Sequence, residues 1–257
     1  MGVSFNHVSG SLAMTLKVHV GTSGWSYDHW GGIFYPEGLR PSERLSFYSE
    51  HFLTVEVNSS FYHLPSVRTV EKWGRAVPSG FIFSAKASRF VTHIKKLRDF
   101  EGPVRNFTDR VRSLGDKLGP ILFQFPPGWH VNRVRLESLL EFLPDDLRYA
   151  FEFRDRSWLS DEIYSILRQH NGAFCIFDMP DFTSTLEVTS DIAYVRMHGG
   201  RSLYASRYSV DELRSWAGRL VEMSSHGVRE IYVYFNNDAY GYAVENAREL
   251  LEILGPA

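Results

Sequence analysis

Charged and amide side chains occupy alternate positions near the ends of several β-rich runs of this chain. Carboxylates and imidazoles transfer protons in acid/base catalysis, whereas guanidinium and ammonium groups bind the phosphate or carboxylate of a ligand. If the apolar residues between them face a layer of helices, the polar residues converge on one interior surface. We therefore predict a polar pocket that contains Glu56, Asn58, Lys86, Gln124, Glu152, Arg154, Arg196, His198 and Asn236.

The residue types suggest a role for each member of this set. Glu152 and His198 are the first candidates for proton transfer, and Glu56 could complete with Glu152 a carboxylate pair of the glycosidase type. Lys86 is expected to be an electrostatic anchor or, if adjacent cations lower its pKa, an imine-forming nucleophile. The competing interpretation is an interior braced by ion pairs such as Glu152–Arg196 or Glu56–Lys86. Candidates for substrate binding are Asn58, Gln124, Arg154, Arg196 and Asn236.

Loop residues add candidate ligand contacts. Gly199, Gly200 and Arg201 follow the seventh β-rich run, where the backbone N–H groups of glycines can approach a phosphate. The same glycines would also suit an ordinary loop. Trp25 and Tyr62 are aromatic candidates for stacking on a nucleobase or a sugar, with a structural role under long loops as the alternative.

A divalent-metal site is a further alternative for the same region. Glu152, Asp178 and His198 lie near the ends of successive β-rich runs, with Glu56 opposite, and oxygen and imidazole ligands suit such an ion. Against it, the sequence contains no HxH, HExxH or CxxC cluster, and the neighbouring cations would repel a metal. The sequence thus identifies no cofactor and leaves a divalent metal as an alternative.

Eight β-rich runs must position these side chains, and amphipathic segments alternate with them. The segment 209–226 has helical periodicity, with Ser209 and Glu212 as a capping box and Gly227 as its stop. Eight strands that alternate with helices favour a single (β/α)8 TIM-type barrel, with parallel strands inside a ring of helices. In this fold the active site lies at the C-terminal mouth of the barrel. The expected strands are 17–21, 53–58, 81–86, 121–125, 148–154, 173–178, 192–198 and 230–236.

Composition limits the function classes. The chain has 257 residues, a formal net charge of −2 and one cysteine, Cys175. This balance excludes a protein that coats nucleic acid or an anionic membrane by bulk charge. A lone cysteine excludes an internal disulfide and suits a reducing compartment, so we expect a cytoplasmic protein without a membrane span. We also expect residues 1–15 to form a disordered tail and residues 16–257 to form one barrel domain.

Ordered sequence blocks carry a family resemblance across the chain beyond its tail. They are GTSGWSYDHWGGIFYP (21–36), VEVNSSFYHLP (55–65), FSAKAS (83–88), ILFQFPP (121–127), FEFRDRSW (151–158), YVRMHG (194–199) and YVYFNND with ENA (232–247). Together they resemble the YecE-like family, known as domain of unknown function 72, and this resemblance implies a TIM-type barrel without an established activity. Many members carry a histidine where this chain has Asp155, which puts in doubt a mechanism that needs an imidazole there.

Two functions fit these observations, and a noncatalytic scaffold is a third possibility. The first is a barrel enzyme that acts by acid/base chemistry on a small anionic substrate, such as a phosphorylated sugar or a nucleotide-like molecule; hydrolase, lyase and isomerase activities are not separated by the sequence. The alternative is a nucleic-acid-binding or nuclease-like barrel, with or without a divalent metal, that uses the basic run 89–98. The same basic run would also suit a solvated helix face.

Overall fold

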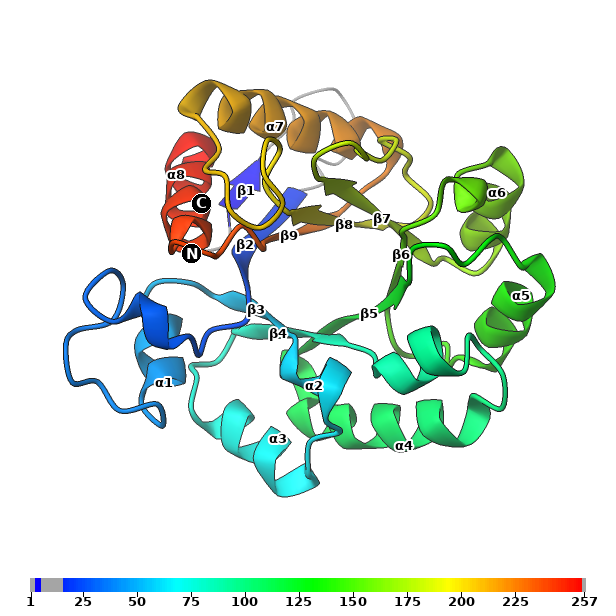
Figure 1. Ribbon diagram of the computed structural model, residues 1–257, viewed down its shortest axis with the longest axis horizontal. Coiled ribbons are helices and arrows are strands. Elements are labelled where there is room, and N and C mark those ends of the chain that lie inside the picture. The colour runs from blue at the N-terminus through cyan, green and yellow to red at the C-terminus, as the bar shows by residue number, and fades with distance from the viewer. Residues whose placement is uncertain (1–2, 6–15, 256–257) are drawn as a thin grey trace.

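A closed barrel of parallel strands forms the centre of the molecule (Figure 1). The computed structural model describes residues 3–5 and 16–255. Each barrel strand pairs in parallel with the next along the chain, and the last pairs with the first and so closes the ring. The predicted TIM-type barrel and its eight strands are therefore confirmed. The strands are β2 (Leu16–Ser23), β3 (Thr54–Val57), β4 (Ile82–Lys86), β5 (Leu118–Phe125), β6 (Tyr149–Phe153), β7 (Ala173–Asp178), β8 (Ile192–Met197) and β9 (Glu230–Phe235).

Helices surround this ring in all but one of the connections (Figure 1). In the fully described connection 179–191, between β7 and β8, a loop takes the place of the expected helix. This segment contains Pro180 and lacks the apolar spacing of a helix, so a helix there would have no face to bury. The helices are α1 (Arg44–Ser49), α2 (Ser59–Tyr62), α3 (Val67–Arg75), α4 (Glu101–Val111), α5 (Arg133–Phe142), α6 (Asp161–Gln169), α7 (Val210–Met223) and α8 (Tyr242–Leu254).

Helix α7 begins where its sequence predicts. The side chain of Ser209 accepts from the backbone N–H of Glu212, whose carboxylate in turn accepts from the backbone of Ser209, so the capping box is confirmed. The chain then passes through a short 3-10 turn, Ser224–His226, and Gly227 adopts φ 87°, the left-handed conformation that favours glycine. These local signals fix both ends of the helix.

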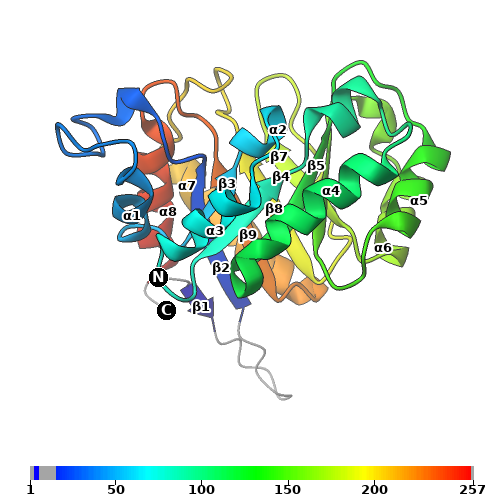
Figure 2. The same cartoon turned by 90° about the horizontal axis from the view of Figure 1, so that it is seen from below.

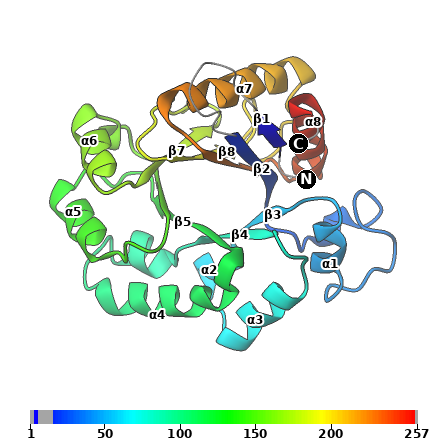
Figure 3. The same ribbon diagram turned by 180° about the vertical axis from the view of Figure 1, so that it is seen from behind.

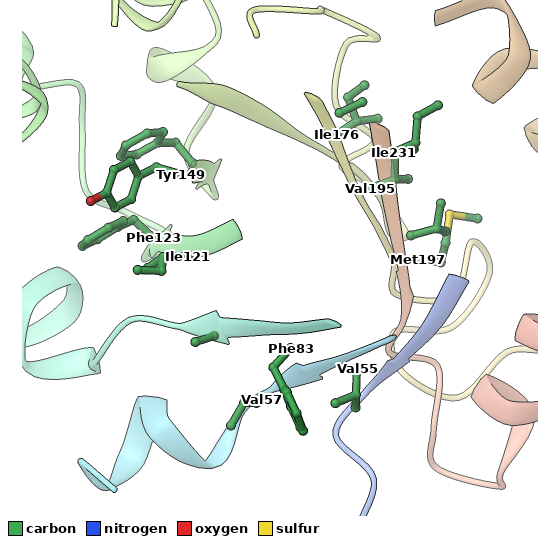
Figure 4. Packing of buried hydrophobic residues seen from close by; sticks show 14 of the residues in the cluster. Val55, Val57, Phe83, Ile121, Phe123, Tyr149, Ile176, Val195, Met197 and Ile231 are labelled. Atoms are coloured by element: carbon green, nitrogen blue, oxygen red, sulfur yellow. The ribbon is translucent and has the colours of Figure 1, made fainter. Parts of the chain in front are cut away.

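The strands present two different faces. Apolar residues at alternate positions, including Val55, Phe83, Phe123 and Val195, point away from the barrel axis toward the helices, as Figure 4 shows. Inside the barrel, a separate buried cluster includes Leu122, Ala150, Cys175, Tyr194 and Tyr234. The polar residues at the C-terminal ends of the strands therefore form a layer over this mostly apolar cluster, which we call the polar layer.

The two ends of the barrel differ. Helix α2 follows β3 directly and lies at the end where the strands finish (Figure 2). At the opposite end, β1 (Val3–Phe5) pairs antiparallel with the start of β2, beside which it lies in Figure 3. Three residues of the expected disordered tail thus form a strand; the remaining twelve lie outside the described residues, where that expectation stays a prediction.

Candidate functional site

Arg196 occupies the centre of the polar layer. Its guanidinium is 1% exposed and donates through Nη2 to Glu56 Oε1 at 2.7 Å and through Nη1 to Glu152 Oε2 at 2.6 Å. A buried charge of either sign would be costly alone, and these bonds offset that cost. The Glu152–Arg196 brace expected from the sequence is present. The strands β3, β6 and β8 are thereby joined across the barrel.

A second set of contacts lies above this brace. Arg154 donates through Nε to the remaining oxygen of Glu152 and through Nη2 to His198 Nε2, which is 2.8 Å away. The amide group of Asn236 contacts His198 Nδ1 at 3.0 Å. Because a guanidinium can only donate, Nε2 is the nitrogen of the imidazole that accepts from Arg154. Six of the predicted pocket residues are therefore one connected network.

This network holds its titratable groups in one protonation state near neutral pH. Burial alone would raise the pKa of Glu152, but the charges of Arg154 and Arg196 outweigh it and hold the pKa well below its usual value. Glu56 behaves in the same way, with Arg196 and Lys86 lowering its pKa against the effect of burial. Burial and the charge of Arg196 lower the pKa of His198 to about 3. At pH 7 the two carboxylates are therefore ionised and the imidazole is neutral.

Lys86, at the end of β4, stands beside the network without joining it. Its side chain is buried, and Nζ lies 4.1 Å from the centroid of the Phe61 ring. Among the described residues, Nζ of Lys86 makes no hydrogen bond and no ion pair. The expected Glu56–Lys86 ion pair is therefore wrong. Glu56 is instead saturated by Arg196, by the Ser23 hydroxyl at 2.7 Å and by the Tyr194 hydroxyl at 2.7 Å.

Burial of this amine changes its ionisation. Desolvation, followed by the positive charge of Arg196, lowers the pKa of Lys86 to about 7. The carboxylates of Glu56 and Glu152 oppose this shift but do not cancel it. Lys86 is therefore the group of the polar layer whose pKa lies close to neutral pH.

The short helix α2 places the surroundings of Lys86. The single hydroxyl hydrogen of Ser60 is shared between the carbonyl oxygens of Lys86, at 2.7 Å, and Val57, at 3.0 Å, and this contact joins the helix to β3 and β4. The next residue, Phe61, is thereby held against Nζ. Asn58, the residue between β3 and α2, has helical backbone angles and lies outside the register that pairs Val57 with Ala85.

A cavity of about 260 Å³ lies against Asn58; neither Lys86 nor Phe61 is among its lining residues. Asn58 contributes to its wall, and its Oδ1 is buried without a hydrogen-bond partner among the described residues. The aromatic walls are fixed: the Tyr27 hydroxyl donates to the Ser23 carbonyl at 2.5 Å, and the Trp25 ring packs edge-on against Trp73. The lining residues are Gly24, Trp25, Ser26, Tyr27, Asn58, Ser59 and Tyr62, so the two predicted aromatic contacts lie together.

Other predicted contacts are less closely connected to Lys86. Gln124 pairs in register with Glu152 and is half-buried, with no hydrogen bond among the described side chains. Gly199 has φ 92°, but its N–H donates to the Tyr208 hydroxyl at 2.9 Å, and that of Arg201 donates to a serine hydroxyl. These amides are occupied within their own loop, as an ordinary loop requires; Gly200 lies exposed between them.

The network also contains residues that the sequence prediction missed. Tyr194 and Ser23 complete the hydrogen bonding of Glu56. Tyr194 lies two and four residues before Arg196 and His198 on the same face of β8, so strand alternation could have found it. Ser23 lies beyond the expected end of its strand, so strand alternation could not have assigned it to the interior.

The metal alternative has little support in this arrangement. Both oxygens of Glu152 accept from guanidinium groups, and Asp178 Oδ1 accepts from the Thr183 hydroxyl at 3.0 Å. Within residues 3–5 and 16–255, no group of three or more His, Cys, Asp and Glu side chains is placed to hold a metal ion. The candidate ligand oxygens are thus engaged by arginine and threonine side chains, which disfavours their coordination of a metal ion.

The fold and this polar layer define a TIM-type barrel with a buried ionic network and a separate amine at its C-terminal mouth. Residues 19–257 match the family model described as "Protein of unknown function DUF72". The chain belongs to this family, as the resemblance of its sequence blocks predicts. In the part of the chain that the structure describes, no helix is long and apolar enough to cross a membrane.

Relatives and solved structures agree with this assignment. The UPF0759 protein YunF of Bacillus subtilis is 29% identical over 270 residues, which cover 92% of this chain and 94% of the relative. A crystal structure of a DUF72 family protein from Thermotoga maritima has a TM-score of 0.84 and 36% identity, covering 92% of this chain and 98% of that one. Another, from Enterococcus faecalis, has a TM-score of 0.80 at 21% identity, covers 93% and 96%, and supports the fold alone.

Proposed function

We propose that the protein is an enzyme that acts by acid/base chemistry on a small anionic substrate at the C-terminal mouth of the barrel, with Lys86 as the group that exchanges the proton. The observation that carries this proposal is the position of Lys86: a buried amine at a strand end, outside the ion pairs around it. A catalytic base works best when its pKa lies near the working pH, and that of Lys86 is about 7.

The sequence-based roles of Glu152 and His198 change in this proposal. Because Glu152 stays ionised and His198 stays neutral at pH 7, neither exchanges a proton readily there. Their bonds to Arg154 and Arg196 make them positioning residues for the surroundings of Lys86.

Charge balance supports an anionic substrate. Arg154 and Arg196 are matched by Glu56 and Glu152, so the network alone is neutral. Protonated Lys86 adds the positive charge that has no partner, and a phosphate or carboxylate group beside it would supply one. The cavity lined by Asn58 and the aromatic rings of Trp25 and Tyr62 suits the sugar or base of such a molecule.

A substrate screen tests this proposal. Phosphorylated sugars and nucleotides are incubated with the wild-type protein, with Lys86→Met and with Lys17→Met, and consumption is followed by mass spectrometry. Lys17 is a matched control because its side chain is 59% exposed and pairs with Glu230 at the opposite end of the barrel. Turnover by the wild type and the control but not by Lys86→Met supports the proposal. Equal turnover by all three, or none by the wild type, contradicts it.

The nucleic-acid alternative rests on a different surface. Phe90 and Tyr62 are 42% and 62% exposed, and Arg89 and Arg98 are exposed nearby in the chain. Base stacking on such rings and phosphate contacts by such arginines would bind a single strand. Oligonucleotide binding that falls steeply with added salt and weakens in Arg89→Ala would favour this alternative. Binding that is absent at low salt would remove it.

A further inference from the structure

We infer that Lys86 forms an imine with an aldehyde or ketone group of the substrate, with the carbonyl carbon bound at Nζ beside the Phe61 ring. This inference rests on the proposed function and deepens it, because it names the reacting group of the substrate. It assigns Lys86 as a nucleophile as well as a proton-exchanging group.

The ion-pair network is what leaves the amine available. A lysine beside carboxylates usually keeps its proton by pairing with one of them. Here Arg196 takes one oxygen of Glu56 and one of Glu152, and Arg154 takes the second oxygen of Glu152. The Tyr194 hydroxyl takes the second oxygen of Glu56. All four oxygens of Glu56 and Glu152 therefore already accept from another donor, and among the described residues neither carboxylate forms an ion pair with Nζ.

The immediate surroundings of Nζ act in both directions on the amine. The Phe61 ring, whose centroid lies 4.1 Å away, stabilises the protonated form through its quadrupole, but burial and the charge of Arg196 outweigh this effect. Burial and the charge of Arg196 lower the pKa to about 7, so about half of the Lys86 side chains carry a free lone pair at that pH. An exposed lysine, with a pKa near 10.4, carries one in fewer than about one molecule in a thousand.

The chemical step balances without an oxidant or a reductant. The lone pair of Nζ attacks the carbonyl carbon, and the C=O π electrons move to oxygen. A proton moves from nitrogen to that oxygen, which gives a carbinolamine. The hydroxyl group then leaves with one further proton from solvent as water, nitrogen loses its second proton to solvent, and a C=N bond forms. The sum is one amine and one carbonyl giving one imine and one water.

An imine at this position serves lyase or isomerase chemistry. Protonation of its nitrogen makes the neighbouring carbon–hydrogen or carbon–carbon bond easier to cleave, because the C=N group accepts the electron pair. The positive charge of a protonated imine replaces that of the protonated lysine, so an anionic group of the substrate keeps its partner. Asn58, the residue between β3 and α2, has a buried Oδ1 without a hydrogen-bond partner among the described residues, and this atom can accept from a hydroxyl group of a ligand.

Reductive trapping tests the inference on the wild-type chain. Glyceraldehyde 3-phosphate, an aldehyde with a phosphate group, is added with sodium borohydride, which reduces an imine to a stable secondary amine. Peptide mapping then compares labelling of Lys86 with that of exposed Lys17 in the same digest, so no variant has to fold. We expect Lys86 to be labelled at least 10-fold faster at pH 7, and this ratio to shrink as the pH rises, because the neutral fraction of an ordinary exposed lysine keeps growing up to and beyond about pH 10.4. Equal labelling at pH 7, or none at Lys86, overturns the inference.

Lys86→Arg and Lys17→Arg extend the test to the intact protein. Arginine keeps a positive charge and forms no such imine, so the fast adduct should vanish in Lys86→Arg and persist in Lys17→Arg. The two proposals fail separately. Turnover that requires Lys86 without trapping would retain the proposed function and reject the imine, whereas trapping at Lys86 without any turnover would retain the imine and reject the proposed function.

Discussion

The amine nitrogen of Lys86 and the ring centroid of Phe61 are 4.1 Å apart. A cation over an aromatic face is stabilised by the ring quadrupole, whereas a neutral amine gains far less. The contact therefore favours the protonated lysine and opposes the effects of burial and of Arg196. The Phe61 ring therefore raises the pKa of Lys86 relative to a site without an aromatic face.

The first prediction removes this tuning. Phe61→Leu keeps an apolar side chain but loses the aromatic face, so the pKa of Lys86 should fall below its present value of about 7. A cation–π contact of about 1 kcal/mol corresponds to a shift of roughly 0.7 pH units. The pH dependence of Lys86 labelling measures it, with Phe61→Tyr as a control that keeps the ring. A midpoint that rises in Phe61→Leu would contradict the assigned contact.

The second prediction concerns the central brace. Arg196→Met leaves Glu56 buried without an ion-pair partner and Glu152 paired with Arg154 alone, and breaking a buried pair costs about 3–5 kcal/mol. Urea unfolding of this variant at pH 7 should show a loss of that size. Arg201→Met is the control, because this arginine is 75% exposed and its pairing with Glu212 contributes less than about 1 kcal/mol. Similar losses in both variants would show that the brace is unimportant.

The third prediction follows from the lowered pKa of Lys86. In the unfolded chain a lysine titrates near 10.4, so between pH 7 and pH 9 the unfolded state binds more protons than the folded state. The free energy of unfolding should therefore rise with pH in this window, by about 2 kcal/mol from this group. Urea titrations at pH 7 and pH 9 measure the rise, and Lys86→Met should reduce it. An unchanged rise in this variant would mean that Lys86 is not the source.

The fourth prediction concerns the acid side. His198 has a pKa of about 3 in the folded protein, against roughly 6.5 when unfolded, so it remains neutral in the fold while the unfolded chain takes up a proton. The contribution of neutral His198 to the free energy of unfolding is fully present above about pH 6.5 and is lost as the pH falls from 6.5 toward 3. Between pH 7 and pH 5 the wild type should lose about 2 kcal/mol from this group. His198→Asn should lose less; His170→Asn, at an exposed histidine, should behave as the wild type does.

Much of the architecture could be predicted because strand alternation and helix caps are local signals. The alternation of Glu152 with Phe151 and Phe153 assigns it to the interior whatever the rest of the chain does. The interior face alone does not determine which ion pairs form. Arg196 reaches both Glu56 and Glu152 because a guanidinium has several donors on two sides, whereas Lys86 offers a single nitrogen. Pairing by proximity along neighbouring strands therefore predicts the wrong partner for Glu56.

The loops were harder to predict. The glycines after β8 suit a phosphate site and an ordinary turn equally, and the Tyr208 hydroxyl that occupies the Gly199 amide lies nine residues farther along the chain. The loop that replaces a helix between β7 and β8 has no effect on the barrel pairing, since β7 and β8 still align.

The hydroxyl of Ser60, shared between the carbonyls of Val57 and Lys86, makes the position of the Phe61 ring depend on β3 and β4 instead of on helix α2. Helix α2 spans only four residues, too few to be stable in isolation. The hydroxyl of Ser60, the residue before Phe61, is bonded to the backbone carbonyl of Lys86, so the helix that carries the ring is joined to the strand that carries the amine. A molecule that enters the mouth thus meets a ring and an amine that are already in place. Ser60→Ala removes one oxygen atom and would loosen the Phe61 ring from its position against Lys86 without altering either side chain.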